Sequence, residues 1–562
     1  MILSSSADTA VLQRVVLAVV LVVVVCVSEG VAGADSGAVS QQEGAALCAL
    51  LHSTRGDSWR WRPEAEAGAV WNCSVDAAGG LVHNPCSHGG SSWQGVTCSG
   101  TPAECSSQVC QVTQLELPLF NMTGHIPPEI GNLTSLEILS MRMNAVTGSI
   151  PVKVGLLTAL RQLLLDFNQL SGPIPVEVGQ LTALERLFLQ VNHLTQPIPV
   201  EIGKLTGLRE LYLHTNEFRG PLPVEVGHLS RLQQIFIHSC QLTGPIPSEV
   251  GHLIDLQHLI LFNNRLNGTI PGEVGNLSAL EQLVLNGNKL SGTIPIQVGR
   301  LTSLDVLYLY GNELTGPIPT EVGNLLSLRQ LHIHTNRLCG SLPVEIGQLI
   351  VLRELNLYTN QLTGSIPVEI GQLTALSHMI LFSNHLTGPI PSEVGNLNAL
   401  EIVFLHGNQL TGYIPVELGQ ITAVQQLVLH TNHLSGPIPP EIGNLTLLQY
   451  LYLHNNYLSG PILPTLVSGL VGVEEFFVYD NLLVGSLPVE MSRMTNIIVL
   501  LMYNNKLTGK LEGVFNYTEQ LFLTTLDFSN NRLTGWLASE MFMLPRLQVL
   551  SLSGTVINDY IR

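Results

Sequence analysis

One phrase recurs along most of this chain at a fixed interval of 24 residues. Residues 427–442 read LVLHTNHLSGPIPPEI, and the asparagine in its sixth place returns in unit after unit. We call these residues the anchor asparagines; they, with one cysteine in the same place, are Asn144, Asn168, Asn192, Asn216, Cys240, Asn264, Asn288, Asn312, Asn336, Asn360, Asn384, Asn408, Asn432, Asn456, Asn481, Asn505 and Asn531. With Phe120 and Thr555 in this place at the two ends, the chain holds about 19 units. A period of this size predicts a solenoid, in which each unit packs only on its neighbours.

The residues of one unit predict its local structure. Leu427 and Leu429 alternate with variable residues, which indicates a short strand with one buried face, and stacked units would join such strands into a parallel sheet. The amide of Asn432 can bond backbone groups that a turn leaves unpaired. Proline in the following Ile-Pro pair ends the extended segment, and the E-hydrophobic-G-x-L run is predicted to cover the far side as a short helix. The fold class is therefore an α/β solenoid.

Composition excludes one class of partner. Charged residues make up 12% of the chain, against roughly 25% in ordinary domains, and the formal net charge is −18. No stripe of Lys and Arg is visible in the sequence. Both features argue against nucleic acid as a partner.

Residues 1–34 are predicted to be a cleaved signal peptide. Arg14 precedes the apolar run Val15–Val27, and Ala32-Gly33-Ala34 offers small residues for cleavage. No later segment reaches about 18 uninterrupted apolar residues, so no membrane span is expected in this chain. The protein is expected to be secreted, extracellular or at the cell surface. After the signal peptide we expect an N-terminal cap at residues 35–111 and the solenoid at residues 112–562.

Cysteines mark the predicted cap, and an even cluster in an exported protein indicates disulfides, with 15 pairings open for six residues. These six are Cys48, Cys73, Cys86, Cys98, Cys105 and Cys110. The open end of a solenoid exposes its core, so a disulfide-rich cap is expected there. Zinc binding is the weaker alternative, because paired C-x2-C spacing is lacking. Cys240 and Cys339 lie about four units apart, too far to bridge, and are predicted to be buried thiols.

A family resemblance becomes specific at Trp93–Cys98, which reads WQGVTC and runs into VTQLEL. Together with the L-T-G-x-I-P-x-E-hydrophobic-G-x-L units, it resembles the plant-type leucine-rich repeat ectodomain of receptor-like proteins and receptor-like kinases. The cap sequence ALCALLHSTRGDSW is similar to caps of algal and other protist members. The resemblance implies a right-handed superhelix with a concave parallel sheet, a second short strand at T-G-x-I-P, and recognition of extracellular ligands.

Seven N-x-S/T sequons fit an exported glycoprotein. The predicted glycosylation sites are Asn72, Asn121, Asn132, Asn267, Asn276, Asn444 and Asn516.

Function is predicted to lie on the concave face. The two variable residues that flank the second leucine of each strand share that face and form a first and a second column along the array. Both columns are rich in aromatic residues and histidine, which suits binding of a peptide, protein or glycan, with a co-receptor as a further partner. The alternative is that like neighbours only stabilise the sheet. The predicted ligand-binding residues are Tyr212, His214, Phe236, His238, Tyr308, Tyr310, His332, His334, Tyr358, Phe404, His406, His430, Tyr452, His454, Phe477 and Tyr479.

Neighbouring imidazoles suggest sensitivity to pH. His406, His430 and His454 would lie roughly 5 Å apart, so ligand binding is expected to change between pH 5 and 8. Metal binding by His332 and His334 is disfavoured, because the neighbouring units offer few carboxylates, and no cofactor or metal is expected.

Catalysis has no visible basis in the sequence. Known hydrolase, phosphate-loop and kinase motifs are absent, and Glu116, Asp166 and Asp527, the acidic members of the columns, lie in non-adjacent units. We therefore expect no enzyme but an extracellular recognition module of the receptor-like protein kind. The alternatives are the ectodomain of a truncated receptor-like kinase, a secreted inhibitor of wall-degrading enzymes, and a structural or adhesive surface protein.

Overall fold

The computed structural model describes residues 39–557, except 62–68, 76–80, 82, 87–92, 101–104, 106–108, 536, 538–540 and 543. The predicted signal peptide lies outside the described residues. The chain forms two compact units that meet between Leu194 and Thr195. The predicted boundary between cap and solenoid at residue 111 stays a prediction.

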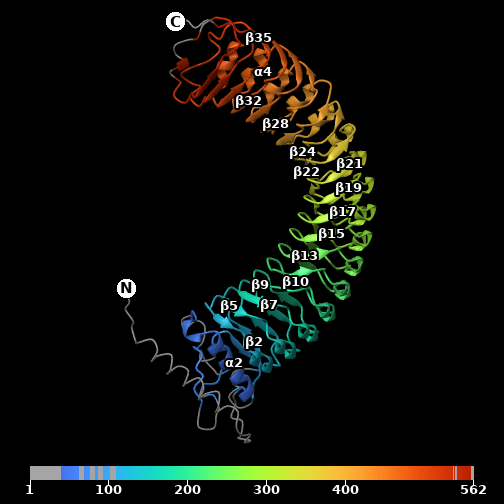
Figure 1. The fold of residues 1–562 in the computed structure, drawn as a ribbon, viewed down its shortest axis with the longest axis vertical. Helices are drawn as coiled ribbons and strands as arrows, with labels where there is room; N and C mark the ends of the chain where they lie inside the picture. The colour runs from blue at the N-terminus through green and yellow to red at the C-terminus, as the bar shows by residue number, and fades with distance from the viewer. Residues whose placement is uncertain are drawn as a thin grey trace, which may run out of the picture. The chain divides into compact units, whose positions relative to one another are not determined.

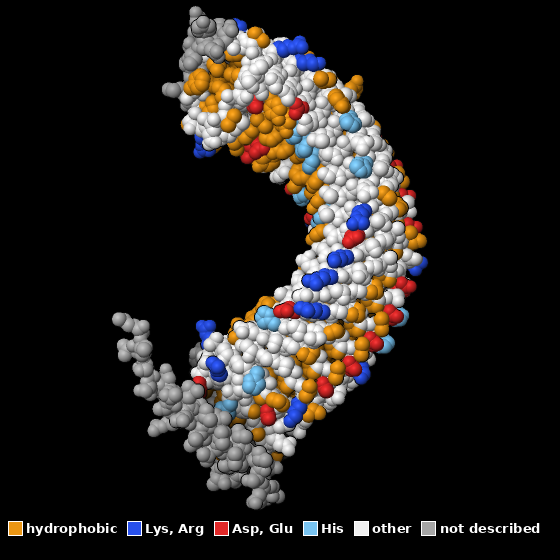
Figure 2. All heavy atoms as spheres, viewed as in Figure 1, with side chains coloured by type: hydrophobic (Ala, Val, Ile, Leu, Met, Phe, Trp, Pro, Cys, Tyr) orange, Lys and Arg blue, Asp and Glu red, His pale blue; other side chains and the backbone are white. Residues whose placement is uncertain are grey.

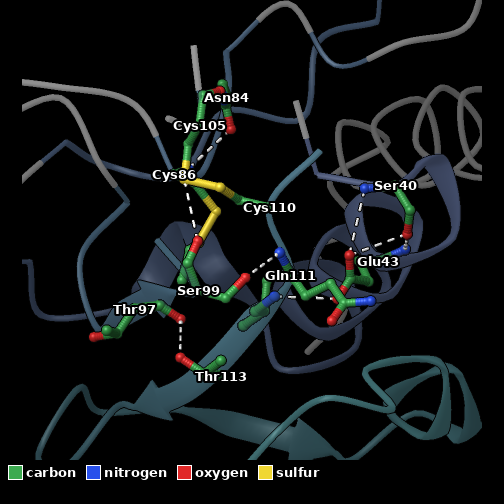
Figure 3. Close-up of a disulfide and its surroundings, with 12 residues drawn as sticks. Ser40, Glu43, Asn84, Cys86, Thr97, Ser99, Cys105, Cys110, Gln111 and Thr113 are labelled. Carbon is green, nitrogen blue, oxygen red and sulfur yellow. Dashed lines mark hydrogen bonds between the residues drawn. A yellow bond between two sulfur atoms is a disulfide. The ribbon is translucent and has the colours of Figure 1, made fainter. Parts of the chain in front are cut away.

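The first unit begins with the helix α2 (Gln41–Ser53). Ser40 and Glu43 form a capping box at its N-terminus. The other carboxylate oxygen of Glu43, a residue only 4% exposed, accepts the N–H of Val112 at 3.1 Å. A buried side chain of the cap is thus bonded to the first strand of the repeats (Figure 3).

Three disulfides close the cap. They join Cys48 to Cys73, Cys86 to Cys98 and Cys105 to Cys110. This set is one of the 15 that the sequence left open. Next to the last of them, Ser99 Oγ accepts the backbone N–H of Gln111 at 3.0 Å (Figure 3). Four tryptophan rings of the cap contact one another in a chain, in the order Trp61, Trp59, Trp71 and Trp93, with centroids 5.1 to 5.2 Å apart.

Strands of the first unit form two ladders. In the main sheet β1 (Val96–Cys98) is antiparallel to β2, and the others run parallel in the order β2 (Val112–Glu116), β4 (Ile138–Ser140), β6 (Gln162–Leu164) and β8 (Arg186–Phe188). The second ladder is β3 (Thr123–His125), β5 (Ala145–Gly148), β7 (Gln169–Gly172) and β9 (His193–Leu194). Along the chain, one 3-10 helix lies between each strand of the second ladder and the next strand of the main sheet. These helices are η3 (Pro128–Asn132), η4 (Val152–Leu156) and η5 (Val176–Gln180); η1 (Gly56–Ser58) follows α2.

In the second unit one parallel sheet runs through all described repeats and lies on the inner side of the unit's curve (Figure 1). Its strands are β10 (Glu210–Tyr212), β12 (Gln234–Phe236), β14 (His258–Ile260), β16 (Gln282–Val284), β18 (Val306–Tyr308), β20 (Gln330–His332), β22 (Glu354–Asn356), β24 (His378–Ile380), β26 (Ile402–Phe404), β28 (Gln426–Val428), β30 (Tyr450–Tyr452), β32 (Glu475–Phe477), β34 (Val499–Leu501), β36 (Thr525–Asp527) and β37 (Val549–Ser551). Consecutive strands pair in register, so equivalent residues of neighbouring units lie side by side.

A second short strand follows in most described units, as the resemblance implies. These strands are β11 (Arg219–Gly220), β13 (Gln241–Gly244), β15 (Arg265–Gly268), β17 (Lys289–Gly292), β19 (Glu313–Gly316), β21 (Arg337–Ser341), β23 (Gln361–Thr363), β25 (Thr387–Gly388), β27 (Gln409–Leu410), β29 (Ser435–Gly436), β31 (Tyr457–Gly460), β33 (Leu482–Ser486) and β35 (Lys506–Thr508).

The predicted outer helix is present as one turn of 3-10 helix, and in one unit as a short α-helix. The segments are η6 (Val200–Lys204), η7 (Val224–His228), η8 (Ser248–His252), η9 (Gly272–Asn276), η10 (Ile296–Arg300), η11 (Thr320–Asn324), η12 (Val344–Gln348), η13 (Val368–Gln372), η14 (Ser392–Asn396), η15 (Val416–Gln420), η16 (Pro440–Asn444), α4 (Pro464–Gly469) and η17 (Val489–Arg493). Neighbouring turns pack closely: a Cβ on Gly227 would lie 2.5 Å from the carbonyl oxygen of Glu249. Glycine in the E-hydrophobic-G run is therefore required by the stacking distance.

The anchor asparagines bond the backbone from inside. Asn264 donates from Nδ2 to the carbonyls of Ile237 and Leu261, at 2.7 and 3.0 Å. Its Oδ1 accepts the N–H of Leu242 at 3.1 Å. Each anchor thus joins its own unit to the one before it, which confirms the expected role of this residue.

Two cysteines of the second unit are free thiols, and the prediction that both are buried is wrong. Cys240 takes an anchor place, and its Sγ donates to the carbonyl of His238 at 3.4 Å, yet it is only partly buried. Cys339 is exposed. It follows the inward-pointing Leu338 in β21, and alternation along a strand turns the next side chain outward.

Candidate functional site

All sixteen predicted ligand-binding residues lie in the second unit, on or directly after strands β10 to β32. They share one face of the sheet because they alternate with leucines of the core, such as Leu451 and Leu453 on either side of Tyr452. Pairing in register places each residue beside its equivalent, as Tyr308 lies beside His332. The structure brings the predicted residues together; ligand binding by them stays a prediction.

Nine rings of the second column form one continuous stack, which we call the ring column. Centroids of neighbouring rings lie 4.0 to 4.5 Å apart, and the ring planes are within 22° of parallel. Its members are Tyr310, His334, Tyr358, Phe382, His406, His430, His454, Tyr479 and Tyr503. A shorter stack of His214, His238 and Phe262 precedes it, and buried Asn286 separates the two.

Stacking changes what this face offers to a ligand. Each interior ring of the column has a neighbour against both faces, so His334 is only 9% exposed and His454 only 8%. The ring column therefore offers a ligand ring edges and polar tips, and not open ring faces. Ring edges carry partial positive charge, whereas ring faces carry partial negative charge.

The first column supplies a second, interrupted row. Tyr308 stacks on His332 at 4.4 Å and Tyr452 on Phe477 at 4.5 Å, while Asn356, Ile380 and Val428 interrupt the rings.

A third column was missed by the sequence analysis. The residue before the first leucine of each strand also faces this side, since it lies two places before the first column. Here Glu354 accepts the amide of Gln330 at 2.9 Å and lies 2.9 Å from His332 Nε2, and Glu475 accepts the hydroxyl of Tyr452. Strict alternation could have found these residues. Carboxylates therefore also stand on this face, in a column other than the two that the sequence analysis considered.

Burial keeps the imidazoles neutral. Loss of solvent lowers the pKa of His406 and His430 to about 4, and of His454 to about 3, with neighbouring histidines adding to the effect at His406 and His454. The expected titration of these rings between pH 5 and 8 is therefore corrected to a range near pH 4. Burial, followed by the charge of Glu354, also raises the pKa of Tyr308 to about 12.

We assign the ring protons from the surroundings of each Nδ1 atom. His430 Nδ1 lies 2.9 Å from the Thr431 hydroxyl, which can donate to it. The Nδ1 atoms of His406 and His454 are buried without a partner. A bare buried acceptor costs less than a bare buried N–H, so we place the proton of each ring on Nε2. The three rings then offer N–H donors one strand apart.

A shallow depression of about 350 Å³ lies over β26, β28 and β30. Its lining combines all three columns: Phe404, His406, Gln426, Val428, His430, Tyr450 and Tyr452. Four of these are predicted site residues.

Within the described residues, no group of three or more His, Cys, Asp or Glu is placed to hold a metal ion. Nor does any helix of that part of the chain have the length and apolar character to cross a membrane.

Comparison with known families matches the repeats. A model described as "Leucine-rich repeat region" matches residues 97–220, and the "Leucine Rich Repeat" model matches 255–277, 303–325, 351–373, 423–445, 447–468 and 522–544. No curated protein matched the chain.

Solved structures are similar over most of the chain. The plant peptide hormone receptor RGFR1, in complex with RGF2, is 32% identical, with 83% of each chain covered and a TM-score of 0.72. The Arabidopsis receptor kinase HAESA, in complex with the peptide hormone IDA and the co-receptor SERK1, is 27% identical; 92% of this chain and 82% of that one are covered, with a TM-score of 0.73. The LRR protein LIC12759 of Leptospira interrogans is 35% identical, covering 68% of this chain and 87% of that one, with a TM-score of 0.51.

Fold, repeats and these likenesses define a leucine-rich repeat solenoid. The chain belongs to the plant-type leucine-rich repeat family.

Proposed function

We propose that this protein is an extracellular recognition module that binds a peptide along the ring column. The observation that carries the proposal is the ring column itself, with the adjoining depression. RGFR1 and HAESA are peptide receptors by name, and HAESA was solved with a co-receptor, so a co-receptor is part of the proposal. Cap disulfides favour an oxidising, extracellular location. No catalytic role is proposed.

A peptide fits this surface better than a glycan. Sugars are held on aromatic side chains by stacking against an open ring face, and the faces in the ring column are covered by their neighbours. Backbone carbonyls, in contrast, are acceptors that suit ring edges and Nε2–H donors.

The length of the ring column sets the length of the ligand. From Tyr310 to Tyr503 it crosses nine strands, so eight spacings of about 4.8 Å give roughly 38 Å. An extended chain covers about 3.3 Å per residue, so a peptide of roughly 11 or 12 residues would follow the whole column.

A peptide library tests the proposal. Twelve-residue peptides would be selected against the full chain, and their dissociation constants measured for His430→Ala and Tyr358→Ala. We expect each variant to weaken binding by about tenfold or more, because both lose an interior ring of the column.

Matched controls carry the same substitutions elsewhere. His252→Ala changes an exposed outer turn and Tyr413→Ala an exposed side chain beside the second strands, and neither should alter affinity by more than about twofold. Selected peptides that bind the ring variants and wild type equally would overturn the proposal.

A further inference from the structure

Charge is distributed unevenly along the solenoid. Residues 354–492 contain ten carboxylates and no Lys or Arg. An even spread of the chain's 24 Lys and Arg over 562 residues would place about six in these 139. Six histidines are the other groups there that could carry positive charge, and burial lowers the pKa of three of them, His406, His430 and His454, to about 4 or 3.

Half of these carboxylates lie on the outer turns, at Glu369, Glu393, Glu417, Glu441 and Glu490. The others lie at the inner sheet or its margins, at Glu354, Glu401, Glu474, Glu475 and Asp480. Figure 2 shows acidic side chains beside the hydrophobic ones on the inner side of this part of the chain. The inner face therefore carries negative charge that no lysine or arginine of the same segment balances.

Glu475 adjoins the depression. In the sheet register it lies directly beside Tyr450, which lines the depression together with Gln426 of the preceding strand. One of its carboxylate oxygens accepts the hydroxyl of Tyr452, another lining residue. Glu474 accepts the Tyr450 hydroxyl at 3.5 Å. Two carboxylates thus stand behind the two tyrosines at one end of the depression.

This arrangement favours a cation over an anion. A guanidinium or ammonium group would find acceptors in Glu475 and in the amide oxygen of Gln426, and the tyrosine rings would cover its alkyl stem. An anionic group would meet the same carboxylates with no opposite charge nearby, and like charges brought together disfavour binding.

We propose that the depression over β26, β28 and β30 receives a Lys or Arg side chain, so that the ligand of the ring column is a basic peptide. The inference rests on the proposed function and adds the charge of the ligand to it. Backbone carbonyls of the peptide contact the Nε2–H donors of the ring column. The cationic side chain reaches sideways to the third column at Glu475. Negative charge along the segment attracts such a peptide from a distance, most strongly at low salt.

Three synthetic peptides test this inference. Each has twelve residues in which glycine alternates with arginine, with citrulline (its uncharged isostere), or with glutamate. Affinity for the full chain is measured by calorimetry at pH 7 and 0.15 M salt. We expect the arginine peptide to bind at least about tenfold more tightly than the citrulline peptide, and the glutamate peptide to bind most weakly.

Charge variants locate the effect. Glu475→Gln should remove most of the arginine-over-citrulline preference, whereas Glu417→Gln, the same change on an outer turn, should leave that ratio within about twofold. Equal effects of the two variants would mean unspecific attraction to an acidic surface and would overturn the inference.

The outcomes also separate this inference from the proposed function. If arginine and citrulline peptides bind equally, and His430→Ala weakens both, the ring column binds peptides and the basic preference is wrong. If binding follows charge but ignores His430→Ala, both proposals fail. Absence of binding by all three peptides overturns the inference as well.

Discussion

Replacing one anchor asparagine tests how the coils hold together. Asn384 is 4% exposed, and its Nδ2 donates to the carbonyls of Leu357 and Leu381, both at 3.1 Å. Its Oδ1 accepts the N–H of Leu362 at 3.0 Å. In Asn384→Ala the Leu362 N–H loses its acceptor inside the core, whereas the carbonyls of Leu357 and Leu381 each keep one donor, from Asn360 and Asn408. One buried unsatisfied N–H costs about 1–3 kcal/mol and each of the two lost hydrogen bonds about 0.5–1.5 kcal/mol, so we expect a loss of roughly 2–6 kcal/mol, concentrated in the affected and preceding units.

Amide hydrogen exchange is the suitable assay, because a repeat array need not unfold in one step. The Leu362 amide should be protected in the wild-type protein and should exchange about thirtyfold or more faster in Asn384→Ala. Asn384→Cys should cost less, since Cys240 holds an anchor place with weaker sulfur contacts of 3.4 and 3.6 Å. Asn396→Ala, on an exposed outer turn, is the matched control. Unchanged protection of Leu362 in the alanine variant would refute the reasoning.

Two further predictions follow from burial. The folded pKa values of His406, His430 and His454 lie below the ordinary 6.5, so the unfolded chain binds more protons at pH 4–6.5. The stability that comes from keeping these three histidines neutral is fully present above about pH 6.5 and is lost as the pH falls toward 4. Urea midpoints of unfolding that stay constant between pH 7.5 and 4.5 would contradict this. Iodoacetamide should label exposed Cys339 in the native protein but leave Cys240, whose pKa burial raises to about 11, unlabelled until unfolding. If mass spectrometry showed that Cys240 and Cys339 are labelled at equal rates in the native protein, the burial of Cys240 would be contradicted.

Much of the fold could be predicted from the repeat alone. Spacing of the leucines fixes which side chains are buried, and the place of each anchor asparagine identifies the end of a strand, because both depend on contacts between adjacent units. The helix α2 has a different kind of signal in the sequence: its capping box is formed by Ser40 and Glu43, which are close together in the chain. The outer segment was predicted as a helix, but its five residues between Pro223 and Leu229 permit one 3-10 turn.

Features that depend on distances between side chains could not be predicted. The sequence places His430 and His454 on one face, yet their 4.1 Å stacking follows from strand spacing and side-chain conformation. Burial of the rings lowers their pKa values. Disulfide pairing in the cap is set by loops whose course no periodicity describes. The third column, in contrast, could have been predicted, because side chains alternate between the two faces of a strand. The same rule would have placed Glu475 on the concave face.

The position of a bound peptide tests the central claim most directly. A selected twelve-residue peptide with a central photoreactive benzophenone would be cross-linked to the full chain, and the adducts located by mass spectrometry. We predict adducts on the face built by β22 to β34, at residues of the three columns such as Tyr358, Gln426 or Tyr479. Adducts confined to the second strands or to the outer turns would contradict the account.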